Sequence, residues 1–250
     1  MPRNRRSYRR MMSHPALATL ALLALLSSGL GGCASAPVDP ACASGVCPPA
    51  TAVEDETINA LYDRRRWASQ QELREIGIDP VRYASEAQIP VLATESRILG
   101  PTPENARQSM AAKIWMIENA RHTVDVMYYI FRTDLTGRAM LAALCDAVIR
   151  GVDVRLMVDS AGSISTSDLA LNWLKLCEAE AGWMVNADGL PTTRRARVEV
   201  VIFNALSKLS SNPNRRSHDK LLLVDAAFPG RALMMTGGRN IALDYYGFTA

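Results

Sequence analysis

The sequence predicts an α/β fold with a mixed, largely parallel sheet flanked by helices, and three observations lead to this class. Short apolar segments rich in β-branched residues alternate with longer segments of helical periodicity between residues 94 and 204. This alternation requires crossover connections, which are right-handed and place helices against a parallel sheet. Two further apolar segments, joined through Pro229-Gly230, have the pattern of an antiparallel hairpin.

Each element has a local signal. Thr102 before Pro103 predicts a helix start, because proline is favoured at the first helical position. Gly151 ends a second helical segment, and Ser167 can cap a third. The predicted helices cover residues 103–120, 135–149 and 167–181. The predicted strands cover residues 123–130, 152–158, 198–203, 221–224 and 232–235.

Composition excludes several classes of protein. The chain has 250 residues, of which 48% are hydrophobic and 21% charged, close to the averages for globular proteins. Collagen-like, coiled-coil and wholly disordered chains are therefore excluded. The formal charge is +3, from 28 Lys and Arg against 25 Asp and Glu, which argues against a large nucleic-acid surface.

The first 32 residues predict an export signal. Five arginines and no acid occur in residues 1–12, and an uncharged stretch rich in Ala and Leu follows over residues 16–32. That stretch is short for a permanent transmembrane helix. The segment Leu30-Gly31-Gly32-Cys33 resembles a bacterial lipobox, in which the cysteine becomes the lipidated first residue; an ordinary cleaved signal is the alternative. We therefore expect a lipid-anchored protein of the bacterial cell envelope that faces the periplasm, and Ala34 after the cysteine favours the outer membrane.

Two further segments are predicted after the signal. Residues 33–93 form a flexible tether and a helical lead-in, since residues 34–53 are rich in Ala, Pro, Ser and Thr and residues 54–75 have a helical pattern. The basic run at residues 64–66 is interpreted as a solvated helix face in preference to a phosphate-binding patch. The ordered α/β domain is expected to begin near Thr94 and to cover residues 94–250.

The five cysteines are an odd number, which lipidation of Cys33 reduces to four. Cys42 and Cys47 lie close enough in sequence to form a small loop in an oxidising compartment. Cys145 and Cys177 fall in apolar helical patterns, where buried free thiols are expected. The spacing suggests no metal site, and we expect no cofactor.

Chemistry is concentrated near the end of the chain, in His218, Lys220 and Asp225. Residues two apart in a strand share a face, so His218 and Lys220 should project together. An imidazole can act as nucleophile or proton carrier near neutral pH, and an ammonium can bind a phosphate oxygen. Asp225, at the strand end, is a candidate to orient a histidine.

A second group of residues completes this pattern. Gly237-Gly238 allows a ligand to approach the backbone closely, and Asn240 adds an amide near an expected helix start. A cationic site lined by amides and lacking metal ligands suits a phosphodiester better than a peptide or a sugar.

The order His-x-Lys-x4-Asp followed by Gly-Gly-x-Asn resembles the signature of the phospholipase D superfamily. Upstream, residues 128–131, 150–155 and 158–160 look like the first half of bacterial cardiolipin synthase-like members. The resemblance covers about residues 94–250. It implies a metal-independent phosphoryl transfer in which one histidine forms a phosphohistidine and a second protonates the leaving alcohol.

The resemblance also implies roles for single residues. His218 would be the nucleophile and Lys220 the phosphate clamp. Asp225 would orient a histidine, while Gly238 and Asn240 would contact the phosphate. The signature occurs once, whereas family members build a site from two copies, so the second motif is expected from a missing C-terminal half or from a second subunit.

Three functions remain open at this stage. The first is a phospholipase D-like or cardiolipin synthase-like phosphatidyltransferase or phosphodiesterase that acts on phospholipids beside the membrane. The second is a single-motif nuclease or phosphodiesterase completed as a homodimer. The third is an anchored phosphate-binding lipoprotein without turnover.

Overall fold

The computed structural model describes residues 42, 46–66, 94–163, 168–205 and 216–248. The predicted signal, lipobox, most of the tether, residues 67–93 and the capping Ser167 lie outside the described residues. The helices are α1 (Glu56–Arg64), α4 (Pro103–Glu118), α5 (Leu135–Ile149) and α6 (Asp168–Leu176), with 3-10 turns η2 (Cys177–Glu180) and η3 (Leu243–Tyr245). The strands are β1 (Thr123–Tyr128), β2 (Asp153–Asp159), β3 (Trp183–Val185), β4 (Pro191–Arg195), β5 (Val198–Phe203), β6 (Lys220–Val224) and β7 (Leu233–Thr236).

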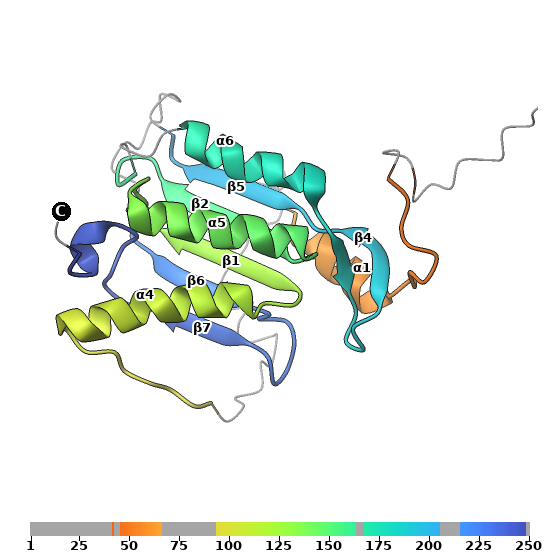
Figure 1. Ribbon diagram of the computed structural model, residues 1–250, viewed down its shortest axis with the longest axis horizontal. Coiled ribbons are helices and arrows are strands. Elements are labelled where there is room, and N and C mark those ends of the chain that lie inside the picture. Colours follow the sequence, from red (N-terminus) through yellow and green to blue (C-terminus); the bar gives the residue numbers. More distant parts are fainter. Residues whose placement is uncertain (1–41, 43–45, 67–93, 164–167, 206–215, 249–250) are drawn as a thin grey trace, which may run out of the picture.

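The main sheet has the strand order β5-β2-β1-β6-β7. Strand β2 pairs in parallel with β1 and with β5, whereas β6 pairs antiparallel with both β1 and β7. The predicted mixed, largely parallel arrangement and the terminal hairpin are therefore confirmed. Helices α4, α5 and α6 lie side by side across one face of this sheet (Figure 1).

Local signals explain where the helices begin and end. The hydroxyl of Thr102 accepts a hydrogen bond from the Asn105 backbone N–H at 3.2 Å and caps α4, as predicted. Helix α5 has its predicted bounds and stops before Gly151, which has a φ of +96°. A Cβ atom at residue 151 would lie 2.1 Å from the Trp183 carbonyl oxygen, so both the turn and the close approach require glycine.

A second, two-stranded sheet was not predicted. It consists of β3 and β4, which pair antiparallel, and β4 contacts α1. Both strands are short, and the Asn186 side chain closes their turn by accepting N–H groups from Asp188 and Leu190. A three-residue strand has too few residues for an alternating pattern to be recognised.

Helix α1 is part of the folded domain, which corrects the expected domain start near Thr94. Its Ile58 and Leu61 side chains are buried in the main hydrophobic core. Val53, just before it, forms a bridge with Thr192 of β4. The folded part of the chain therefore includes residues that were expected to lie in the lead-in.

Arg65, immediately after α1, is buried and bridges two strands, so the expected solvated face does not describe it. Its guanidinium forms ion pairs with Asp125 of β1 at 2.8 Å and Asp153 of β2 at 2.7 Å. Asp153 also pairs with Arg197 at 3.1 Å. Side chains alternate between the two faces of β1, so Asp125 points away from the main core. Its ion pair with Arg65 therefore attaches α1 to the sheet face opposite α4–α6.

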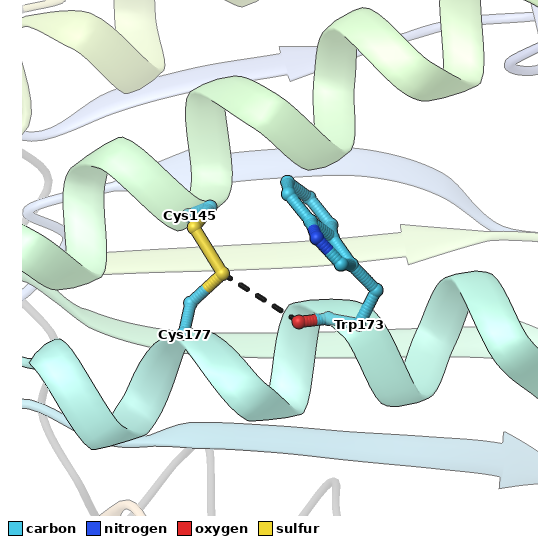
Figure 2. Close-up of a disulfide and its surroundings, with 3 residues drawn as sticks. All are labelled: Cys145, Trp173 and Cys177. Carbon is cyan, nitrogen blue, oxygen red and sulfur yellow. Dashed lines mark hydrogen bonds between the residues drawn. A yellow bond between two sulfur atoms is a disulfide. The ribbon is translucent and has the colours of Figure 1, made fainter. Parts of the chain in front are cut away.

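Cys145 and Cys177 form a disulfide between α5 and η2, which contradicts the expected free thiols. Figure 2 shows the bridge beside Trp173, whose backbone carbonyl lies 3.5 Å from the Cys177 sulfur. The prediction failed because a buried cysteine in a helical pattern looks the same in the sequence whether its sulfur is a free thiol or part of a disulfide. Cys42 and Cys47 also form a disulfide, which confirms the predicted small loop.

Within the described ranges, no helix combines the length and the apolar character needed to cross a bilayer.

Candidate functional site

His218 and Lys220 come together where β6 begins. Lys220 is the first residue of β6 and pairs with Tyr128 of β1. Its Nζ atom lies 3.2 Å from Nδ1 of His218 and 3.0 Å from the His218 carbonyl oxygen. The imidazole is exposed, whereas Lys220 is buried, and this burial lowers the pKa of the Lys220 ammonium despite the nearby Asp219. The pair thus offers a reachable nitrogen beside a partly desolvated cation.

Tyr129, which follows β1, adds an aromatic surface to this pair. Its ring centroid lies 4.5 Å from that of His218, at an interplanar angle of 43°. The Lys220 Nζ atom lies 5.5 Å from the centre of the same ring. In the sequence, Tyr129 belongs to a segment that carries the family resemblance. Residue spacing alone does not predict its contact with His218.

The chain around Tyr129 is fixed by polar side chains from two other segments. The Ser163 hydroxyl donates to the Tyr129 carbonyl at 2.9 Å, and the Asn240 carboxamide oxygen accepts from the Ile130 N–H at 3.0 Å. A Cβ atom at Gly162 would lie 2.2 Å from the Tyr129 carbonyl oxygen. Asn240 is buried and its carboxamide oxygen holds this loop, while its expected contact with a substrate phosphate stays a prediction.

Asp159, at the end of β2, fixes the segment that precedes the motif. Its buried carboxylate accepts hydrogen bonds from the backbone N–H groups of Ala161, Gly162 and Ser217. Ser217 directly precedes His218, so Asp159 determines how the chain enters β6. Asp159 belongs to residues 158–160, which carry part of the family resemblance, but the sequence predicts no role for it.

Asp225 lies at the opposite end of β6 from His218, so its expected role of orienting a histidine does not concern the His218 ring of the same chain. The carboxylate instead accepts hydrogen bonds from the backbone N–H groups of Arg121, His122 and Thr123. It also accepts from the Arg231 guanidinium at 3.2 Å. Asp225 therefore joins the far end of β6 to the start of β1, which makes it a positioning residue.

A cavity of about 570 Å³ opens beside the motif. It has an apolar part that includes Ile98, Met234 and Met235, and a polar part that includes Lys220 and Gly238. Ile98 and Met234 are largely solvent-exposed, at 93% and 66%. The cavity thus combines a cationic wall with an exposed apolar border, and the predicted phosphate contact of Gly238 stays a prediction.

The Lys220 contact has a consequence for the His218 tautomer. Since an ammonium only donates, Nδ1 of His218 must accept, and a neutral ring then carries its proton on Nε2. Nucleophilic attack through Nε2 needs the other tautomer, with the proton on Nδ1 and a partner that accepts it. Within the described part of the chain no such acceptor is bonded to the ring.

Comparisons with known proteins identify the family of the chain. The profile of the family described as "Cardiolipin synthase, PLD-like domain" matches residues 114–246. Cardiolipin synthase C of Escherichia coli is 32% identical over 154 residues, which are 58% of this chain and 28% of the synthase. A cardiolipin synthase of Geobacillus sp. (strain WCH70) is 25% identical over 209 residues, which are 78% of this chain and 34% of that protein. The chain thus spans about a third or less of these relatives.

Two solved structures are similar in part. NucT from Helicobacter pylori has a TM-score of 0.37 at 17% identity, over 58% of this chain and 74% of that chain. Nuc from Salmonella typhimurium, described as a phospholipase D family member, has a TM-score of 0.32 at 19% identity, over 54% of this chain and 66% of that chain. The profile match includes β1 to β6, the motif residues and the Gly-Gly-x-Asn segment. By this match, the chain belongs to the cardiolipin synthase family of phospholipase D-like domains.

Proposed function

We propose that the chain supplies half of the active site of a phosphatidyltransferase or phosphodiesterase that acts on phospholipids. The observation that carries the proposal is the contact between His218 and Lys220 beside a cavity that is cationic on one side and apolar at its border. A phospholipid presents the same combination, an anionic phosphodiester next to acyl chains. A polar phosphodiester such as DNA gains nothing from exposed Ile98 and Met234.

In the proposed reaction, Nε2 of His218 attacks phosphorus. The N–P bond forms as the bond between phosphorus and the leaving alcohol breaks, and an acid from a second motif protonates that alcohol. Lys220 turns from Nδ1 to a phosphate oxygen, which stabilises the developing charge and frees Nδ1 to hold a proton. Water or an acceptor alcohol then attacks the phosphohistidine and releases the product.

The second motif has two functions in this scheme. It provides the acid for the leaving alcohol and a group that accepts the Nδ1 proton of His218. We propose that it comes from a C-terminal half or from a second subunit. The relatives' greater length supports this proposal, since the matched region is only 28% and 34% of the two synthases named above.

The test is a substrate panel applied to whichever assembly is active, the 250-residue chain or a chain extended by its genomic downstream sequence. We expect His218→Asn to abolish turnover of a fluorescent phosphatidylglycerol, with DNA cleaved poorly by both proteins. Asp188→Asn is the control, because it changes an exposed side chain in the turn between β3 and β4, away from the motif. Full activity of His218→Asn would overturn the assignment, and preferential cleavage of DNA would favour the homodimeric nuclease.

We also propose that the protein is exported and lipid-anchored at Cys33, facing the periplasm. The two disulfides support export, because disulfides persist in oxidising compartments. Metabolic labelling with a radioactive fatty acid tests this proposal. The wild-type chain should be labelled, and Cys33→Ser should not. An unlabelled wild-type chain in the soluble periplasmic fraction would contradict the lipid anchor and indicate an ordinary cleaved signal.

A further inference from the structure

Helix α4 buries a lysine on its core-facing side. Lys113 lies among the buried positions of this helix, together with Ser109, Met110, Met116 and Ile117, and is 3% exposed. The periodicity of such a helix calls for an apolar residue here. A buried cation is costly unless it is paired, so a position that breaks the pattern in this way suggests a function.

Lys113 has no carboxylate partner in the described structure. Its Nζ atom lies 2.9 Å from the Ser109 hydroxyl and 5.4 Å from the centre of the Tyr246 ring. No ion pair of Lys113 occurs among the described residues. An ammonium has three N–H donors, so the serine satisfies only one of them.

The cavity beside the motif lies next to Lys113. Lys113, Ser109 and Tyr128 all line it, as do Lys220 and Arg239 from the motif segment. These side chains supply N–H and O–H donors. Four cationic side chains and one acidic side chain line the cavity: Lys113, Lys220, Arg239, Arg97 and Glu95. The net positive charge of this lining therefore favours an anion near Lys113 as well as near Lys220.

Two further observations concern the surroundings of Lys113. Burial, together with the positive charge of Arg239, lowers the pKa of Lys113 to about 8, so the group is still mostly protonated at neutral pH. The hydroxyl oxygen of Tyr246, whose ring faces Lys113, is buried without a hydrogen-bond partner. Burial raises the Tyr246 pKa, while Arg239 opposes that rise, which places Arg239 near both groups.

We propose that Lys113, with Ser109, Tyr128 and Arg239, forms a second anion-binding subsite that takes a phosphoryl group beside the one held by Lys220. The inference rests on the proposed function, because it assigns a neighbour to the phosphate that His218 would attack. It goes further by giving the site a second phosphate, on the same ligand or on a second one. The cavity that both lysines line is large enough for two such groups.

The test measures binding and needs no turnover. The amide signals of the full chain are followed by NMR while inorganic phosphate, or a short-chain water-soluble phosphatidate, is added. We expect two groups of shifts, one around Lys113 on α4 and one around Lys220 and Gly238. Lys113→Met should abolish the first group, or weaken it about tenfold or more, and leave the second. A tighter response to phosphatidate identifies a lipid phosphate as the ligand, and equal responses identify a free phosphate.

Two controls keep the result specific. Lys175→Met removes a lysine on α6 that does not line this cavity, and it should leave both groups of shifts unchanged. Ser109→Ala keeps the charge and removes the Nζ hydrogen bond, so an intermediate loss is expected. The proposal is overturned if Lys113→Met, folded by circular dichroism, binds both probes as the wild type does. Full lipid turnover in His218→Asn with intact binding at Lys113 would overturn the proposed function alone, whereas lost turnover without any shifts around Lys113 in the wild type would overturn the subsite alone.

Discussion

The Tyr129 ring lies against the His218 imidazole, with centroids 4.5 Å apart, and also lies 5.5 Å from the Lys220 ammonium. One aromatic side chain thus contacts both residues that would handle the phosphate. Tyr129 itself is fixed through its carbonyl by Ser163 and through its N–H by Asp219. Its ring therefore limits the rotamers open to His218.

We predict that Tyr129→Leu lowers kcat for phosphodiester turnover by about tenfold, because the lost ring contacts are worth about 0.5 to 1.5 kcal/mol each. KM should change little. Tyr129→Phe, which keeps the ring, should restore activity. Steady-state kinetics of the active assembly measures both, and equal losses in the two variants would mean that the hydroxyl, not the ring, matters.

Asp225 should be essential for stability rather than for proton transfer. Asp225→Ala leaves buried backbone N–H groups of residues 121–123 and the Arg231 guanidinium without their acceptor. We expect the free energy of unfolding to fall by about 3 kcal/mol. Urea denaturation measures this loss. Asp146→Ala, an exposed carboxylate on α5, is the control and should change stability by less than about 0.5 kcal/mol.

Arg65 and Arg64 form a natural pair for testing the attachment of α1. Arg65→Met removes the cation that the buried Asp125 and Asp153 carboxylates share, while each keeps one other arginine partner, so a loss of about 2 to 3 kcal/mol is expected. Arg64 is exposed and its Nε bonds the Ala60 carbonyl, so Arg64→Met should have little effect. Thermal unfolding of the two variants decides the matter, and similar melting temperatures would contradict the proposed role of Arg65.

The bridge between Cys145 and Cys177 should contribute substantially to stability. It closes a loop between residues 32 apart, which corresponds to about 3 to 4 kcal/mol in the chain-entropy account. The Cys145→Ala/Cys177→Ala protein should lose that amount in urea unfolding. The Cys42→Ser/Cys47→Ser protein is the comparison, since residues only 5 apart give about 2 kcal/mol at most. A larger loss in the second protein would contradict the expectation.

Lys113 gives the stability a specific pH dependence. Its pKa is about 8 in the fold against 10.5 in the unfolded chain, so the unfolded state binds more protons between these values. The penalty from Lys113 is therefore complete below pH 8 and disappears as the pH rises toward 10.5. Lys113→Met should be more stable than the wild type by about 3 kcal/mol at neutral pH. That advantage should shrink by about pH 9.5, as measured by unfolding in urea. A constant difference would mean that Lys113 is not the titrating group.

Much of the fold could be predicted because its signals are local. The bounds of α5 and β5 follow from apolar periodicity and from a terminal glycine or turn. The Thr102 cap follows from three consecutive residues. His218 and Lys220 belong to the same group, since they are two residues apart at the start of β6 and their side chains meet there. What could be predicted in the site is thus the part that lies within three consecutive residues.

The rest depends on contacts between distant residues. Arg65 and Asp153 are 88 positions apart, and nothing in a run of three arginines shows which one meets a buried carboxylate. The roles of Asp225 and Asn240 follow from backbone groups more than 100 positions away, and a backbone N–H has no signature in a sequence. The burial of Lys113 likewise depends on how α4 packs beside β6, two elements that are distant in the sequence.

Under the proposed anchoring at Cys33, the docking of α1 would limit how far the domain can lie from a membrane. Only the 19 residues 34–52 separate Cys33 from Val53, where the folded part begins. Because the Cys42–Cys47 disulfide holds two Cα atoms of this linker 4.4 Å apart, the linker can span about 50 Å at most, against about 190 Å for residues 34–93. The shorter linker would keep the domain in a thin layer next to the bilayer, where its local concentration at the lipid surface is high.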